Sequence, residues 1–316
     1  MGRSARSVAG RSLEVSRIWL DGRLVDATAP HLSVYDRGFQ LGDGIFETAR
    51  ARRGVVIELD DHLERLRQSA TALAIRLPVD DAAMVAGIDA LLEAEGLAGS
   101  GLDGQPLGDA ALRITVSRGP LGRRGLLPPG FDEVPATIAI QVWPYAPPPA
   151  EVVARGIRAI SSAVRRDPHS PLAGIKSTSR ADYVYAKLEA ARAGVDDALF
   201  LTTDGAISEG TTANVWLVAG RTLVTPPLGA AVLPGTTRTW LLANTPELGL
   251  EPQESDISPD RLIAADEAFL SSSVAGIVPL TAFDGRTVGN GRPGPWTANL
   301  RAAREAAIDA QGRAGR

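Results

Sequence analysis

Cysteine is absent from this sequence of 316 residues. Disulfide bonds, thiolate nucleophiles and cysteine-ligated metals are therefore excluded. Histidine is nearly as scarce, since only His31, His62 and His169 occur. Their spacing fits neither the H-E-x-x-H nor the H-x-H pattern, so we expect no histidine-based metal site.

Positive charge is not in excess either. The chain has 33 Lys and Arg against 37 Asp and Glu, which gives a formal net charge of -4. This balance offers no basic surface for a nucleic-acid backbone and no polybasic patch for a membrane. No segment has the ~18 uninterrupted apolar residues of a membrane-spanning helix. We therefore expect a cytoplasmic protein that binds neither nucleic acid nor membrane.

The length and composition predict a globular protein of two domains. Hydrophobic residues make up 44% of the chain and charged residues 22%, and 316 residues can bury a sizeable core. Residues 1–16 are rich in Arg, Ser and Gly without a signal-like apolar run, and we expect a flexible arm. The prolines of segment 144–150 predict a stiff linker between a small N-terminal domain (17–143) and a larger C-terminal domain (151–316).

The N-terminal half carries alternating apolar patterns and two stretches with helical spacing. Asp21-Gly22 predicts a tight hairpin turn, and Asp60 is the expected N-cap of a helix that contains Leu63, Leu66 and Ala70. The expected strands are 18–20, 23–25, 44–53, 55–57, 111–117 and 138–142, and a second helix is expected at 80–95.

The C-terminal half mixes the two element types in an irregular order. That order favours an α+β or mixed α/β architecture over a simple doubly wound sheet. The expected strands are 152–163, 198–202, 214–218, 268–272 and 276–280, and the expected helices are 179–193, 236–248 and 259–265.

Two ionisable residues in this half can carry chemistry. Lys176 ends an apolar stretch just before a helix, where a desolvated amine has a lowered pKa and can form an imine with an aldehyde. Glu209 follows the Asp204-Gly205 turn, and a carboxylate of this kind can keep a pyridine nitrogen protonated. Read alone, each has an ordinary alternative: a surface lysine at a helix start, and a solvated glutamate at a turn.

Several other residues can bind anions. Thr236 and Thr237 lie where a turn enters a helix, which is either an anion site or a plain capping segment. Arg65 on a helix can pair with a phosphate or remain on the surface. Hydroxyl donors occur at 271–273, and the loop arginines Arg118, Arg123 and Arg124 either receive a substrate carboxylate or stay solvated.

Six segments occur in an order that resembles the class IV, or fold-type IV, enzymes that use pyridoxal 5'-phosphate (PLP). These enzymes include branched-chain aminotransferases, D-amino-acid transaminases and aminodeoxychorismate lyases. The resemblance covers about residues 17 to 290. The six segments are 36–47, 62–66, 174–177, 208–214, 233–238 and 265–279.

The resemblance implies an α/β (α+β) fold of two domains with PLP between them, and a homodimer whose active sites use residues of both subunits. It implies that Lys176 is the Schiff-base lysine and proton shuttle, and that Glu209 is the partner of the pyridine nitrogen. The phosphate-binding residues that it implies are Arg65, Thr236, Thr237 and Ser273.

The resemblance also implies the reaction. The first hypothesis is a transaminase that moves an amino group between an amino acid, of D or branched-chain type, and a 2-keto acid by a ping-pong mechanism. The second is a lyase that splits aminodeoxychorismate into p-aminobenzoate and pyruvate, and the third is a non-catalytic relative that keeps the fold.

Three residues are the candidates for substrate binding. Phe46 stands where relatives have a pocket-lining aromatic residue, and Arg180, one helical turn after Lys176, is a candidate partner for a carboxylate. Arg123 matches the carboxylate-binding arginine of D-amino-acid transaminases, although Gly125 stands where those enzymes have a histidine.

Overall fold

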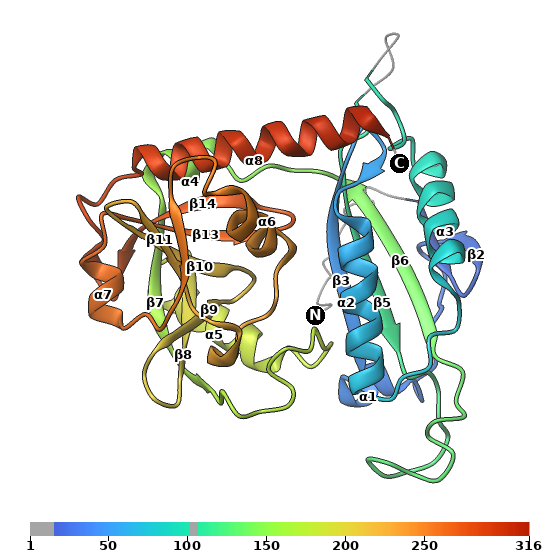
Figure 1. Ribbon diagram of the computed structural model, residues 1–316. Coiled ribbons are helices and arrows are strands. Elements are labelled where there is room, and N and C mark those ends of the chain that lie inside the picture. Colours follow the sequence, from blue (N-terminus) through green and yellow to red (C-terminus); the bar gives the residue numbers. More distant parts are fainter. Residues whose placement is uncertain (1–15, 102–106, 316) are drawn as a thin grey trace, which may run out of the picture.

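The chain forms two β-sheets that lie side by side (Figure 1). The computed structural model describes residues 16–101 and 107–315. The arm expected at residues 1–16 lies outside this range except for Ser16, whose backbone N–H and hydroxyl both donate to the Glu95 carboxylate at 2.9 Å.

The first sheet has six strands in the order β2-β1-β6-β5-β3-β4, and all neighbours are antiparallel. The expected tight turn joins β1 to β2, with positive φ at both Asp21 (45°) and Gly22 (90°). The strands are β1 (Arg17–Leu20), β2 (Arg23–Asp26), β3 (Gly44–Arg52), β4 (Val55–Val56), β5 (Ala110–Ser117) and β6 (Thr137–Pro144).

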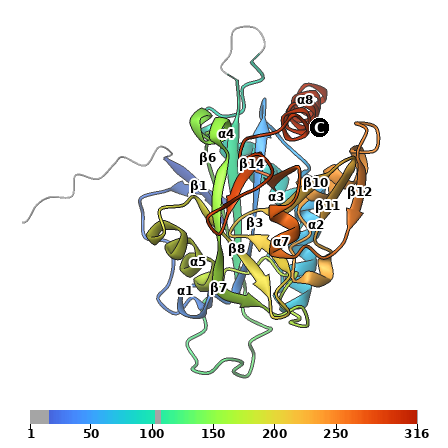
Figure 2. The same cartoon turned by 90° about the vertical axis from the view of Figure 1, so that its left-hand side faces the viewer.

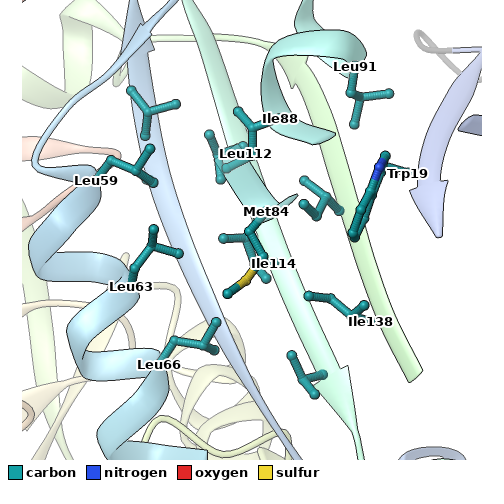
Figure 3. Close-up of a cluster of buried hydrophobic side chains, with 14 of the residues drawn as sticks. Trp19, Leu59, Leu63, Leu66, Met84, Ile88, Leu91, Leu112, Ile114 and Ile138 are labelled. Atoms are coloured by element: carbon teal, nitrogen blue, oxygen red, sulfur yellow. The ribbon is translucent and has the colours of Figure 1, made fainter. Parts of the chain in front are cut away.

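Helices α2 (Leu59–Ala72) and α3 (Asp81–Ala94) cover one face of this sheet. Their apolar residues recur at helical spacing and meet alternate residues of the strands, such as Leu112 and Ile114 of β5, in one buried cluster (Figure 3). The other residues of β3 and β5 point to the opposite face, toward the second sheet. This alternation supplies the side chains of the site described below.

The second sheet has nine strands in the order β12-β11-β10-β13-β14-β7-β8-β9, with β15 paired to β14. Because β9 pairs with β8 and also, through Asn214 and Glu209, with β10, the strands from β10 round to β9 form a closed ring. The strands are β7 (Ile157–Arg166), β8 (Asp197–Thr202), β9 (Ile207–Gly210), β10 (Asn214–Ala219), β11 (Thr222–Thr225), β12 (Glu251–Glu254), β13 (Glu267–Ser272), β14 (Gly276–Phe283) and β15 (Arg286–Thr287).

Shorter helices surround the second sheet, and the long helix α8 (Pro295–Ala314) lies across the ends of both sheets (Figures 1 and 2). Ion pairs attach α8 to the first sheet, between Glu305 and Arg50 and between Arg304 and Glu58, each at 2.7 Å. The other helices are α1 (Arg37–Leu41), α4 (Ala150–Arg155), α5 (Ala181–Arg192), α6 (Thr236–Asn244), α7 (Pro259–Ile263) and the 3-10 turn η1 (Leu228–Ala230).

The segment between β6 and α4 contains the expected prolines and has no regular structure. On this basis we propose residues 17–143 and 151–316 as the two domains. Helix α8 nevertheless contacts both sheets, so the C-terminal part of the chain also covers the N-terminal sheet. None of the helices in the described ranges has the length and apolar character that a membrane crossing requires.

The mixed α/β architecture is confirmed, and two local predictions are wrong. Residues 152–163 do not form one strand, because helix α4 occupies Ala150–Arg155 and β7 starts only at Ile157. Pro149 suits the start of a helix, where no N–H is needed, and Gly156 (φ 78°) ends it. Asp60 does not cap α2 either. The N-cap is Glu58 in a left-handed conformation, and Asp60 lies in the first turn.

Glycine at position 87 provides a test of how closely α3 packs on the first sheet. A Cβ added to Gly87 would lie 2.5 Å from Cε2 of the buried Trp19. Gly87→Ala gains about 1 kcal/mol of helix propensity, but overpacking costs about 1–3 kcal/mol. We expect a net decrease in the free energy of unfolding, measured by urea denaturation. In a Trp19→Leu background the same substitution should stabilise the protein; an equal loss in both backgrounds would contradict this packing account.

Candidate active site

A cavity of about 460 Å³ lies between the two sheets. Side chains from the first sheet, from the start of α5 and from the loops at the ends of β9, β10 and β13 form its wall. Its lining residues include Phe46, Thr48, Arg65, Arg113, Trp143, Lys176, Arg180, Tyr183, Glu209, Asn214, Gly235, Thr236, Thr237 and Ser273. The residues singled out in the sequence for PLP or substrate binding all lie on this wall, apart from the loop arginines Arg118, Arg123 and Arg124.

Lys176 reaches the cavity because its backbone is attached to the first sheet. Phe46 N–H donates to the Lys176 carbonyl at 2.9 Å, and Thr178 N–H donates to the Gly44 carbonyl at 2.8 Å. A Cβ on Gly44 would lie 2.6 Å from the Val116 carbonyl oxygen, so this close approach requires glycine. These bonds extend β3 by a short bridge to the C-terminal half of the chain.

The Lys176 side chain has an electrostatic environment that suits a nucleophile. Burial lowers its pKa to about 8, the Arg65 and Arg180 guanidinium groups lower it as well, and the Glu47 and Glu209 carboxylates oppose the shift. The amine is therefore neutral in a much larger fraction of molecules near pH 7 than an unperturbed lysine is. The only other lysine of the sequence is Lys187, an exposed residue of α5 whose Nζ pairs with Asp197 at 3.1 Å.

Glu209 lies at the wall of the cavity with its carboxylate held in a defined orientation. Its Oε1 accepts a hydrogen bond from the Tyr183 hydroxyl at 3.1 Å, and its Oε2 accepts one from Leu233 N–H at 3.0 Å. The Arg166 guanidinium lies 3.7 Å from Oε1. The sequence pattern identified Glu209 but not these neighbours.

Thr236 and Thr237 begin helix α6 with hydroxyls that are available to a ligand. Both Oγ1 atoms are buried, and neither has a hydrogen-bond partner in the described parts of the chain. The N-cap residue is Gly235, which has no side chain to cap the helix. A buried unpaired hydroxyl is costly, and a helix N-terminus attracts anions. The arrangement fits a bound phosphate group.

Arg65 completes this anion site from helix α2. Its Nε and Nη2 donate to the Glu47 carboxylate at 2.8 and 2.6 Å, and its Nη1 donates to the Pro234 carbonyl, next to α6. Burial opposes ionisation of Glu47, but hydrogen bonds from Arg65 and from His62 outweigh it and lower the pKa of Glu47 to about 2. Glu47 therefore fixes the arginine as a permanent counter-charge, a role that the sequence motifs alone do not indicate.

Ser273 lies on the other side of the cavity, in the loop after β13. Its hydroxyl donates to the Thr48 carbonyl at 2.9 Å, so this atom already has a partner on the first sheet. Ser271, which also lines the cavity, accepts a hydrogen bond from the Trp216 indole N–H at 2.9 Å.

Phe46 lies between cationic groups. The Arg113 Cζ atom lies 3.8 Å from the centre of the Phe46 ring, the Lys176 Nζ 5.0 Å and the Arg180 Cζ 5.6 Å. Arg180 donates to the Thr211 carbonyl at 3.0 Å, and Arg113 donates to the Thr115 hydroxyl at the same distance. Neither guanidinium forms an ion pair with a carboxylate in residues 16–101 and 107–315. Arg113 was missed in the sequence. Its place among apolar residues of an alternating strand was the available signal.

The arginines of the loop at 118–130 have different roles from those at the cavity. Arg118 is buried and pairs with Asp43 at 2.8 Å, which makes it part of the scaffold. Arg123 is exposed, and its one hydrogen bond among the described contacts runs to the Pro129 carbonyl at 3.4 Å. Its assignment as a substrate ligand stays a prediction that requires a second subunit.

The sequence was compared with known proteins. Residues 44–283 match the family described as "Amino-transferase class IV". A putative branched-chain-amino-acid aminotransferase of Methanocaldococcus jannaschii is 37% identical over 286 residues, which cover 90% of this chain and 94% of that protein. A D-alanine aminotransferase of Bacillus licheniformis is 30% identical (92% and 97% covered), and an aminodeoxychorismate lyase of Bacillus subtilis strain 168 is 30% identical (84% and 86% covered).

The fold has close structural relatives as well. The crystal structure of a branched-chain amino acid aminotransferase (from the organism abbreviated T.th.) with pyridoxamine 5'-phosphate superposes with a TM-score of 0.85 at 25% identity, covering 94% of this chain and 95% of that chain. The family model spans more than half of the sequence, and the relatives match nearly its full length. These findings confirm the resemblance drawn from the six motifs, and the chain belongs to the class IV aminotransferases.

Proposed function

We propose that this protein is a PLP-dependent transaminase that moves an amino group from an amino acid to a 2-oxo acid. The observation that carries the proposal is the single cavity that unites the Lys176 amine, the Glu209 carboxylate and the unpaired Thr236 and Thr237 hydroxyls. The low pKa of Lys176 is the electrostatic property that this chemistry needs.

PLP supplies an aldehyde for the amine and a pyridine ring that withdraws electrons from the substrate. Lys176 Nζ is the group that would bind the aldehyde, and the Glu209 carboxylate would hold the proton on the ring nitrogen. Arg65, the two threonine hydroxyls and the first N–H groups of α6 would bind the phosphate. The relative of known structure that binds pyridoxamine 5'-phosphate supports this choice of cofactor.

Lys176 also serves as the base. Once the substrate amine has taken its place at the aldehyde, the free Nζ accepts the proton that leaves the substrate α-carbon and returns it at a neighbouring carbon. Arg180 and Arg113 on either side of Phe46 are the cations that would bind substrate carboxylates, since neither has an acidic partner in the described structure. The 2-oxo acid leaves, and the second half-reaction uses the same groups in reverse.

A lyase is the second candidate. It is favoured by one observation, the 30% identity to an aminodeoxychorismate lyase over 267 residues. The lyase needs the same lysine for proton transfer, so the cavity wall accommodates both reactions. What separates them is the need for an amino-group acceptor.

We further propose that the protein is a homodimer. Large apolar side chains are exposed around α1 and in the adjoining loop, and such patches mark interaction sites. The two segments form one surface, because Arg37 donates to the carbonyls of Gly125 and Leu126. Arg123 lies in the same loop, where a second subunit would meet it. The exposed residues are Leu32, Val34, Tyr35, Phe39, Leu41, Leu126 and Leu127.

The first prediction concerns the reaction. The PLP-loaded enzyme should lose its visible absorbance band when it meets one class of D- or L-amino acid, and pyridoxamine 5'-phosphate should form. Lys176→Ala should slow this half-reaction by about 10²- to 10⁴-fold, whereas Lys187→Ala should leave it unchanged. Release of pyruvate from aminodeoxychorismate without any 2-oxo acid, together with no response to amino acids, would instead identify the lyase.

The second prediction concerns pH. The pKa of Lys176 is lowered, so its reactive neutral form appears as the pH rises through about 8. Binding of PLP by the apoprotein, fixed by borohydride and followed by mass spectrometry of the Lys176 peptide, should rise with a midpoint near 8. An unperturbed lysine would place the midpoint near ~10.4, and that result would remove the proposed environment. The peptide containing Lys187 provides the internal control for the reagent.

The third prediction concerns the dimer. Phe39→Glu places a charge on the exposed apolar surface and should convert the dimer into a monomer, measured by analytical ultracentrifugation. Leu248→Glu, at another exposed leucine, should keep the dimer. If Arg123 acts across the interface, mixing inactive Lys176→Ala and Arg123→Ala subunits should restore activity through one intact site per mixed dimer. A wild-type monomer would refute the dimer proposal.

A further inference from the structure

We propose that Tyr183 is a positioning residue that connects the two ends of the active site, with its hydroxyl orienting Glu209 and its ring supporting Arg180. The inference rests on the proposed function and adds a residue to which neither the sequence motifs nor the relatives' names assign a role.

Tyr183 lies in the first turn of α5, seven residues after Lys176. Its hydroxyl donates to Glu209 Oε1 at 3.1 Å. The Arg180 Cζ lies 3.0 Å from the centre of the Tyr183 ring, and the Arg166 Cζ lies 4.9 Å from it. The edge-to-face contact with Phe200, at 5.0 Å between ring centres and 72° between planes, keeps the ring in this place.

The phenol is suited to donate its proton to Glu209 and not to lose it. Burial raises the pKa of Tyr183, and the neighbouring Glu209 carboxylate raises it further, while Arg166 and Arg180 oppose this shift. The hydroxyl therefore stays protonated at the pH values at which the enzyme would act. Without it, Glu209 Oε1 would keep only the Arg166 guanidinium at 3.7 Å, and the carboxylate could turn about its bond to Leu233 N–H.

The ring has a separate task. Arg180 enters the cavity with a hydrogen bond to the Thr211 carbonyl at 3.0 Å, and the aromatic face of Tyr183 is its principal other support. A guanidinium stacked on a ring keeps its outer N–H groups free for a carboxylate. The hydroxyl and the ring of one side chain thus act on different partners, and substitutions can separate them.

The test compares Tyr183→Phe, which removes only the hydroxyl, with Tyr183→Leu, which also removes the ring. Tyr185→Phe on the same helix is the matched control, because Tyr185 is 47% exposed and does not line the cavity. The readouts are the rate of the amino-acid half-reaction, the pH midpoint of the visible absorbance of bound PLP, and the dissociation constant of isocaproate, a carboxylate that cannot react, measured by calorimetry.

Tyr183→Phe should slow the half-reaction by about tenfold or more and shift the absorbance midpoint, since a hydrogen bond to a charged group is lost. Its affinity for isocaproate should stay within about twofold of wild type, since the aromatic face remains. Tyr183→Leu should show the same losses and also weaken isocaproate binding by about three- to thirtyfold. If Tyr183→Leu does not fold, Tyr183→Met takes its place.

Two outcomes would overturn the inference. One is a Tyr183→Phe enzyme that matches Tyr185→Phe in rate and absorbance midpoint, and the other is a Tyr183→Leu enzyme that binds isocaproate as tightly as Tyr183→Phe does. A wild-type protein that binds PLP but converts no amino acid would refute the proposed function instead. In that case the absorbance midpoint and isocaproate affinity still decide the role of Tyr183.

Discussion

The attachment of segment 176–178 to strand β3 is the constraint on which the site depends. Two backbone hydrogen bonds, from Phe46 N–H to the Lys176 carbonyl and from Thr178 N–H to the Gly44 carbonyl, join a residue of the C-terminal half to the N-terminal sheet. They place the only lysine of the cavity beside the ring of Phe46. Loss of this register would remove the amine from the anion site and from Glu209 together.

Strand β3 also divides its side chains between two tasks. With a period of two, Glu47 points to the face covered by α2, where it holds Arg65, while Phe46 and Thr48 point into the cavity. The same nine-residue strand thus orients the arginine of the anion site and lines the substrate side. Helix α8 keeps the other end of the strand in place through the pair between Glu305 and Arg50.

The charges of the cavity follow a consistent pattern. Arg65 is balanced by Glu47, and Glu209 has Arg166 near it, so these buried ions have counter-charges on the protein. Arg113 and Arg180 lack such partners in the described structure, and burial lowers the pKa of each. Together with the desolvated Lys176, they give the substrate side an excess of positive potential, as an anionic substrate requires.

Local patterns in the sequence were sufficient for most strands and helices, because alternation, helical spacing and turn residues act over a few positions. The ordered motifs predicted the family, the fold class and the residues of the anion site. Partners distant in sequence were not predictable. Glu58, not Asp60, begins α2 in a structure where it pairs with Arg304 of the distant helix α8, and Arg113 and Tyr183 become part of the site only when the two sheets meet. The domain boundaries, the cytoplasmic location and the role of Arg123 stay predictions. The sequence determined which chemistry the chain carries, since side-chain type is local. The tertiary structure decided which of those groups share one desolvated cavity, since burial and charge neighbours exist only after folding.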